Sequence, residues 1–202
     1  EGVFGAGVNF SNIGTKMSYT ETLDRDFIPM NMRLGASVKI ALDDYNTIEF
    51  LADVNKLLVP TPPTYYSAGD VLANGDTVRN GDFIIRSGKD PNRSVASAVF
   101  TSFNDAPGGF KEELREFTYS LGMEYWYDKQ FAIRAGYFHE HPTKGNREYF
   151  SLGLGLKYNV FGLDLSFLIP TDQRHPLENT LRFSLLFDFD AFKEQNKATT
   201  NL

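Results

Sequence analysis

Thirteen consecutive residues, MNMRLGASVKIAL from Met30 to Leu42, alternate between apolar side chains and side chains that are small, polar or basic. A side-chain period of two predicts a β-strand, because successive side chains of a strand point to opposite faces. Strands of soluble proteins usually have about five or six residues. A strand this long instead fits the hydrocarbon layer of a membrane, which a tilted strand crosses in about 9–11 residues.

The same alternation recurs along the chain between turn signals, and it predicts an all-β fold of eight antiparallel strands. These strands are expected near residues 2–10, 29–42, 47–57, 112–127, 131–141, 148–158, 163–170 and 179–189. Their connections alternate in length. The short ones are 43–46, 128–130 and 159–162, and the longer ones are 11–28, 58–111, 142–147 and 171–178. Such alternation is typical of up-and-down transmembrane β-barrels, with short periplasmic turns and long extracellular loops.

Composition narrows the class of protein. The 202 residues carry a net charge of −6, which does not suggest a nucleic-acid partner, and they contain no cysteine. The polar strand faces are rich in glycine and serine with isolated charges of both signs, as a crowded barrel lumen would be. A soluble β-domain with an apolar interior stays as an alternative, although its outer face should be richer in lysine and glutamate. The first residues already have the strand pattern, so we expect the chain to begin inside a longer protein.

Opposite charges on the predicted polar face fall on facing positions of the two strands that each short turn connects. A three-residue turn at 128–130 and another at 43–45 each place opposite charges on facing positions, and a four-residue turn at 159–162 does the same. Such pairs would discourage a register slip. The predicted luminal pairs are Lys39 with Glu49, Glu124 with Arg134, and Lys157 with Asp164.

The longest loop, 59–111, carries apolar residues outside the strand pattern. Asp90-Pro91 is expected to begin a short helix that ends near Phe103, before Pro107-Gly108-Gly109. A loop of this length inside an ordered domain is usually functional. Its apolar side chains could fold inward as a plug or face a partner, and we take them as candidate partner-binding residues: Phe83, Ile84, Ile85, Val99, Phe100, Phe103 and Phe110.

Motifs for catalysis or metal binding are weak. His139 and His141 share one strand face but have no third ligand in view, and histidines alone do not complete a zinc site. Glu49 and Asp53 could act as an acid and a base, but luminal ion pairing is the favoured interpretation. No motif marks a hydrolase nucleophile. The sequence predicts neither a catalytic residue, a metal nor a cofactor.

Three segments carry a resemblance to a known family. They are SNIGTKMSY at 11–19, SVASAVFTSFNDAPGGFKEELREFTYSLGMEYWYDKQFAIRAGYF at 94–138, and REYFSLGLGLKYNVFGLDLSFLIP at 147–170. They resemble the C-terminal half of the PorV (LptO) family. Members of this family are outer-membrane barrels of the type IX secretion system of Bacteroidetes, and they are related to FadL-type transporters. The resemblance implies that these strands are part of a larger, 14-stranded FadL-like barrel. The strand pattern and the loop lengths predict barrel strands within 1–190, with a long extracellular loop at 59–111, and a periplasmic tail at 191–202.

The resemblance also implies a function. Family members are non-enzymatic shuttles or adaptors that dock at the type IX translocon and bind the C-terminal signal domain of secreted cargo. They deliver that cargo at the cell surface to an attachment complex that contains a sortase. The expected surroundings are outer-membrane lipid, with no nucleic acid. The alternative is a FadL-like outer-membrane transporter of hydrophobic small molecules.

Overall fold

The computed structural model describes residues 1–18, 25–171 and 180–189. It is all-β, with 51% strand and 8% helix. The chain divides into two compact units. The strand unit consists of Glu1–Gly7, Leu34–Val54 and Thr118–Leu202, and the loop unit consists of Val8–Arg33 and Asn55–Phe117.

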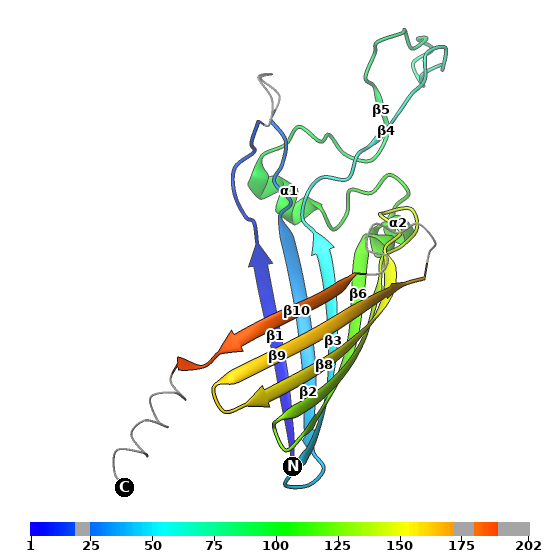
Figure 1. Cartoon of the computed structure of the whole chain (residues 1–202). Helices are drawn as coiled ribbons and strands as arrows, with labels where there is room; N and C mark the ends of the chain where they lie inside the picture. The colour runs from blue at the N-terminus through cyan, green and yellow to red at the C-terminus, as the bar shows by residue number, and fades with distance from the viewer. Residues whose placement is uncertain (19–24, 172–179, 190–202) are drawn as a thin grey trace, which may run out of the picture. The chain divides into compact units, whose positions relative to one another are not determined.

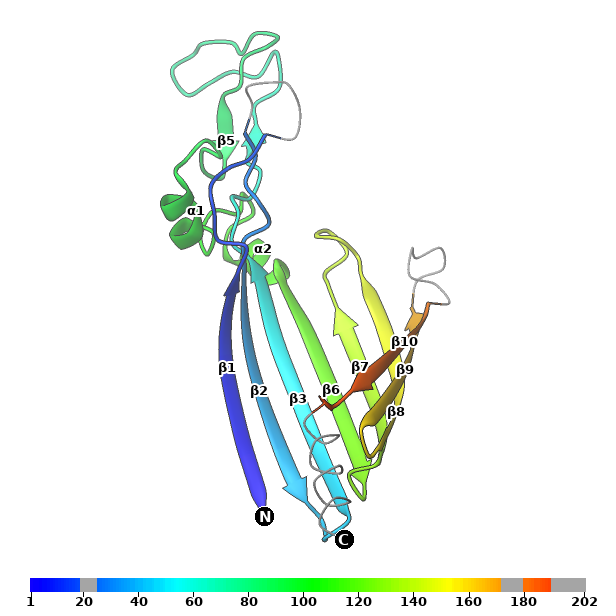
Figure 2. The same cartoon turned by 60° about the vertical axis from the view of Figure 1, so that its left-hand side comes forward.

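Eight long strands form one antiparallel sheet in the order β1-β2-β3-β6-β7-β8-β9-β10 (Figure 1, Figure 2). Sequence neighbours are therefore also neighbours in the sheet, which confirms the predicted eight-stranded up-and-down order. In the part of the chain that the structure describes, β1 and β10 end this order and do not pair with each other, so the sheet is open. The bounds are β1 Gly2–Ser11, β2 Asn31–Ala41, β3 Asn46–Leu57, β6 Phe117–Tyr127, β7 Phe131–His139, β8 Glu148–Tyr158, β9 Phe161–Pro170 and β10 Leu181–Phe187.

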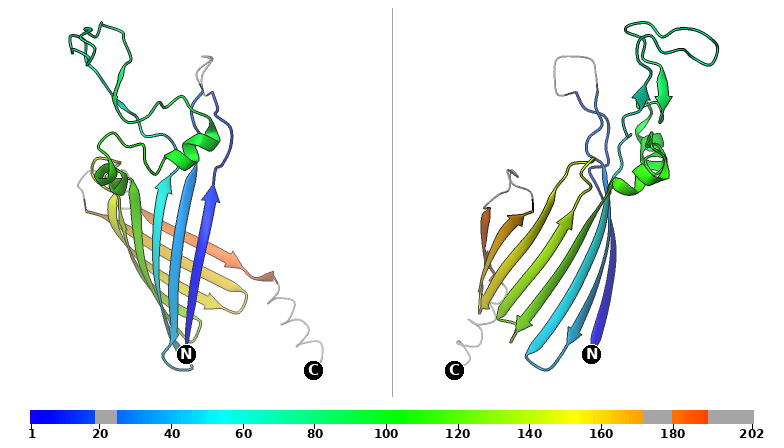
Figure 3. Two further views of the ribbon diagram at one scale, coloured as in Figure 1. Left: turned by 180° about the vertical axis from the view of Figure 1, so that it is seen from behind. Right: turned by 90° about the vertical axis from the view of Figure 1, so that its right-hand side faces the viewer.

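Most strands are as long as the alternation predicted. The strand that contains the opening stretch, β2, has 11 residues, and β3 beside it has 12. Figure 3 shows β1, β2 and β3, drawn in blue to cyan, running side by side. These lengths match the roughly 9–11 residues that a tilted strand needs to cross a bilayer.

Residues with left-handed backbone conformations close two of the short turns. Asp128 and Lys129 have φ of 52° and 55° in the three-residue turn that places Tyr127 opposite Phe131. Asn159 has φ of 49° in a turn of only two residues, so that Tyr158 faces Phe161. The predicted four-residue turn at 159–162 is therefore wrong. Asparagine tolerates this conformation better than most residues, which makes the tighter turn accessible.

Two sequence predictions about helices need correction. Residues 112–115, predicted as the start of a strand, belong to helix α2, Phe110–Arg115. The helix predicted to start at Asp90-Pro91 begins later, as α1, Val95–Thr101. Ser94 caps α1, because its side chain accepts a hydrogen bond from the Ser97 amide at 3.3 Å.

The loop unit contains the buried apolar core. Met30, Leu58 and Ala98 are fully buried there, in contact with Phe27, Ile28, Met32, Val59, Val95 and Val99. The short strands β4, Thr64–Tyr65, and β5, Ile85–Ser87, pair with each other in the same unit. Neither α1 nor α2 is long and apolar enough to cross a membrane, and this holds for every helix in the described ranges.

Candidate functional site

The large apolar side chains of the strand unit lie on its exposed face. On β8 and β9 every second residue is apolar and exposed, whereas the residues between them are half-buried or buried, except for the exposed Lys157. A soluble β-domain shows the reverse pattern, with its apolar side chains inside. The exposed apolar and aromatic residues on these two strands are Phe150, Leu152, Leu154, Leu156, Tyr158, Phe161, Leu163, Leu165, Phe167 and Ile169.

An ion-pair network lies on the opposite, polar face. Arg134 on β7 bonds Glu124 on β6 through Nε, and its Nη1 lies 2.5 Å from Asp164 Oδ1 on β9. Glu124 also accepts a hydrogen bond from the Trp126 indole, and the Arg134 guanidinium lies over the Trp126 ring. One cation thus joins three strands by spanning β8.

Glycine makes this span possible. Gly155 on β8 lies opposite Ala132 on one side and Asp164 on the other. A Cβ at this position would come within 2.8 Å of Arg134 Nη1 and 2.9 Å of Asp164 Oδ1. The absence of a side chain at Gly155 therefore leaves room for Arg134 to reach Asp164.

The three predicted luminal pairs have different outcomes. Glu124 lies opposite Arg134 as predicted, and the two are bonded. Lys157 lies opposite Gly162 instead of Asp164, because the turn is two residues shorter than assumed. Asp164 binds Arg134 instead.

The third pair, Lys39 with Glu49, has a turn that fits the prediction. The Leu42 amide donates to the Asn46 carbonyl at 2.8 Å, and Asp43 Oδ1 accepts from the Tyr45 and Asn46 amides at 2.8 Å each. In the described residues, however, Lys39 and Glu49 make no ion pair with each other. Their pairing stays a prediction.

A buried charge cluster in the loop unit was missed by the sequence analysis. Lys56 at the end of β3 is fully buried, and its Nζ lies 3.2 Å from Glu113 Oε2 and 2.7 Å from Glu116 Oε2. Glu116 Oε1 accepts a hydrogen bond from the Thr61 hydroxyl at 2.7 Å. Period-two patterning assigned Lys56 only to a strand face, so it gave no signal that distant carboxylates converge there.

Asp105 extends this cluster. Glu113 Oε1 accepts hydrogen bonds from the amides of Asp105 and Ala106 at 2.5 and 2.8 Å. The Asp105 carboxylate lies 3.1 Å from Arg93 Nη2, while its other oxygen is buried without a hydrogen-bond partner. Burial raises the pKa of Asp105 above its ordinary value, although the Thr61 hydrogen bonds and Arg93 act in the opposite direction.

The same cluster has the spacing of a cation site, because Asp105, Glu113 and Glu116 each offer an oxygen within 4.8 Å of the others. The Lys56 ammonium already lies within ion-pair distance of two of the three carboxylates. A bound metal is thus not needed to offset their charge. The cluster instead ties β3 to α2 and to the chain before α2.

The candidate partner-binding residues differ in exposure. Phe83, Phe100 and Phe110 are 83%, 81% and 77% exposed, and Phe103 is less so. The remaining three, Ile84, Ile85 and Val99, are half-buried, and Val99 packs against the loop-unit core.

The two weaker candidates for chemistry are not assembled into sites. His139 stacks on Tyr137 and lies 3.8 Å from Glu148, whereas His141 contacts Thr143 at 3.0 Å. Neither histidine belongs to a three-ligand group within the described ranges. Glu49 and Asp53, on β3, are likewise outside any such group there.

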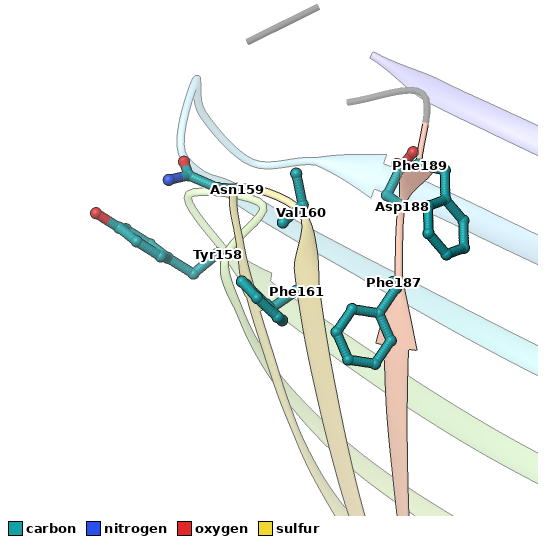
Figure 4. A pocket seen from close by; sticks show the side chains of 7 residues that line it. All are labelled: Tyr158, Asn159, Val160, Phe161, Phe187, Asp188 and Phe189. Atoms are coloured by element: carbon teal, nitrogen blue, oxygen red, sulfur yellow. The ribbon is translucent and has the colours of Figure 1, made fainter. Parts of the chain in front are cut away.

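A pocket of about 430 Å³ lies on the apolar face of the strand unit. Side chains from the β8–β9 turn and from the end of β10 line it (Figure 4). The centroids of the Phe161 and Phe187 rings lie 5.2 Å apart. The lining residues are Tyr158, Asn159, Val160, Phe161, Phe187, Asp188 and Phe189. Their rings share the exposed face with the apolar residues of β8 and β9, so the pocket continues that surface.

These features define a class of protein. An open, antiparallel, long-stranded sheet with apolar side chains exposed on one face and ion pairs on the other is what a section of a transmembrane β-barrel wall presents. The model of the family described as Type IX secretion system protein PorV matches residues 1–64, which contain β1, β2 and β3. This match confirms the resemblance to the PorV family over residues 1–64, whereas the segments at 94–138 and 147–170 lie outside it.

The family match supports a role in type IX secretion. PorV is a family of outer-membrane secretion components and not a known enzyme family. No curated protein matches the chain. The assignment to the C-terminal half of the family stays a prediction.

Proposed function

We propose that this chain is part of a non-enzymatic outer-membrane shuttle or adaptor of the type IX secretion system. It binds the C-terminal signal domain of cargo at the translocon and delivers the cargo to the sortase-containing attachment complex. The apolar strand face contacts lipid, the short turns face the periplasm, and the long loop 59–111 faces the outside. The predicted tail at 191–202 lies outside the described residues.

The observation that carries this proposal beyond the family match is the exposure of Phe83 and Phe100 on an ordered loop unit. Phe83 meets the Tyr65 ring edge-on, with ring centroids 6.0 Å apart. Phe100 projects from α1, whose Ala98 and Ser102 are buried. The Tyr65 contact therefore restrains the Phe83 ring, and the helix fixes the backbone of Phe100, before any partner arrives. Such order lowers the entropy cost of binding. Exposed aromatic side chains of this kind are typical anchors of protein interfaces.

A FadL-like transporter of hydrophobic molecules fits less well. Such a transporter needs a continuous apolar path, but the polar face carries Arg134 bonded to both Glu124 and Asp164. A pocket of about 550 Å³ on this part of the sheet has Arg134, Lys157 and Asp164 in its lining beside apolar side chains that include Leu156, Leu186 and Phe187. Charged groups of this kind favour a protein-handling role over passage of apolar solutes.

The test is co-purification of the full-length protein with the translocon and with cargo from native outer membranes. Deletion of residues 82–107 would remove Asp105 and the core residue Ala98, so point variants are sharper. Phe83→Ser combined with Phe100→Ser should reduce recovery of translocon or cargo while the amount of protein in the outer membrane is unchanged.

Val71→Ser is the matched control, because Val71 is exposed in the same loop but is aliphatic. Recovery should be close to that of the unaltered protein. Full recovery of both partners by the double phenylalanine variant would rule out this surface as the docking site.

A further inference from the structure

The short helix α2, Phe110–Arg115, has a polar side that is anchored and an apolar side that is not. Glu113 is buried and bound to Lys56 and to the amides of Asp105 and Ala106. These bonds fix the rotation of the helix about its axis. Phe110 and Leu114, by contrast, are exposed.

Helical geometry gathers the exposed residues by type. Each residue advances about 100° around an α-helix, so Phe110 and Leu114, four apart, lie on one stripe. Lys111, which is exposed, and Arg115, which is half-buried, each follow one of them by one residue and form a basic strip on one side of this stripe. The helix therefore presents an apolar stripe with cations along one edge, a pattern found in helices that lie in the interface of a membrane.

The chain continues from α2 directly into an apolar strand face. Only Glu116 separates α2 from β6, on which Tyr119, Leu121 and Met123 are exposed at alternate positions. Tyr119, the first exposed apolar residue of β6, thus follows Leu114 closely in the sequence. If the strand unit is a barrel wall, Tyr119, Leu121 and Met123 face lipid. This sequence continuity favours lipid over a protein as the occupant.

We propose that α2 is an interfacial anchor, with Phe110 and Leu114 in the boundary between lipid head groups and acyl chains. Lys111 and Arg115 reach the phosphates of the head groups, as long basic side chains do at membrane surfaces. This assigns Phe110 to lipid and separates it from the docking residues Phe83 and Phe100. The inference rests on the outer-membrane placement in the proposed function.

Spin labels on single cysteines can test the proposal, because these 202 residues contain no cysteine. The full-length protein would be reconstituted in vesicles of phosphatidylethanolamine and phosphatidylglycerol and labelled in turn at Phe110→Cys, Leu114→Cys, Leu121→Cys and Phe83→Cys. Collision rates are then measured with oxygen, which concentrates in lipid, and with a water-soluble nickel chelate. Labels at positions 110, 114 and 121 should favour oxygen, and the label at 83 should favour nickel.

The reference positions separate two kinds of failure. Nickel access at 110 and 114 with oxygen access at 121 would overturn the anchor and leave the barrel wall intact. Nickel access at 121 as well would refute the outer-membrane placement itself. Protection of 110 and 114 from both reagents would mean that protein covers α2, which also overturns the proposal. Retention of the loop unit in each variant is checked by its resistance to proteolysis.

Discussion

Removal of the buried Lys56 ammonium should strongly destabilise the loop unit. In Lys56→Met the side-chain volume stays similar, but Glu113 and Glu116 lose the cation that lies 3.2 and 2.7 Å from them. Their side chains are only 5% and 12% exposed, so water cannot replace the lost partner fully. Breaking a buried ion pair on one side typically costs about 3–5 kcal/mol.

Hydrogen exchange measured by mass spectrometry can detect this loss. Peptides that cover residues 105–116 contain the amides of Asp105 and Ala106, which donate to Glu113. A loss of about 3–5 kcal/mol corresponds to exchange that is roughly 10²- to 10⁴-fold faster. The exchange rate has an upper limit, which is the rate of the same segment when it is fully unfolded.

Two further variants sharpen the result. Lys89→Met removes an exposed lysine from the same loop, so exchange over 105–116 should stay close to that of the unaltered protein. Adding Glu116→Gln to Lys56→Met removes one of the two negative charges that Lys56 offsets. This double variant should recover part of the protection of residues 105–116 from exchange. Unchanged exchange in Lys56→Met alone would refute the view that this cluster holds the loop unit together.

Three other changes test the strand faces and the loop. Leu121→Arg, on the exposed face of β6, should cost about 2–4 kcal/mol of stability in the membrane. Ser120→Arg, on the other face, should cost less when both are measured in the same folding titration. Equal costs would mean that the lipid and lumen faces are wrongly assigned. Gly155→Ala should lower the unfolding midpoint because a Cβ there comes within 2.8 Å of a guanidinium nitrogen, whereas Gly7→Ala, with nothing within 4 Å, should not; a lowered midpoint for both would count against steric crowding as the cause. Because burial raises the pKa of Asp105, the folded loop holds this proton more tightly than the unfolded chain, so loop protection should fall as pH rises from the ordinary aspartate pKa through the raised one. Asp105→Asn should remove that part of the pH dependence in hydrogen exchange, and an identical profile in the variant would contradict the assignment.

Local patterning determined the strands. Alternation in stretches such as Met30 to Leu42 and Phe150 to Leu156 was sufficient to predict their type, approximate bounds and order, because a side-chain period of two has few other solutions. It also indicated which face is apolar. The three-residue turn at 128–130 was predicted correctly, since it brings Glu124 opposite Arg134.

Local patterning misassigned places where a tertiary contact outweighs periodicity. Residues 112–115 alternate weakly, yet they are helical, and Glu113 is bound to a lysine 57 positions away. The Lys157 pair was misassigned because the length of the 159–160 turn depends on the backbone conformation of Asn159, which composition does not report.

The sequence by itself therefore determined a wall of long, one-sidedly apolar strands, because strand alternation is a property of neighbouring residues. Beyond the Glu124–Arg134 pair, only the tertiary structure decided which charges meet. Arg134 reaches Asp164 across the gap left by Gly155, and Lys56 meets Glu113 and Glu116 from a different part of the chain. Such contacts join residues far apart in sequence, so their geometry depends on how the strands and the loop unit fold in space.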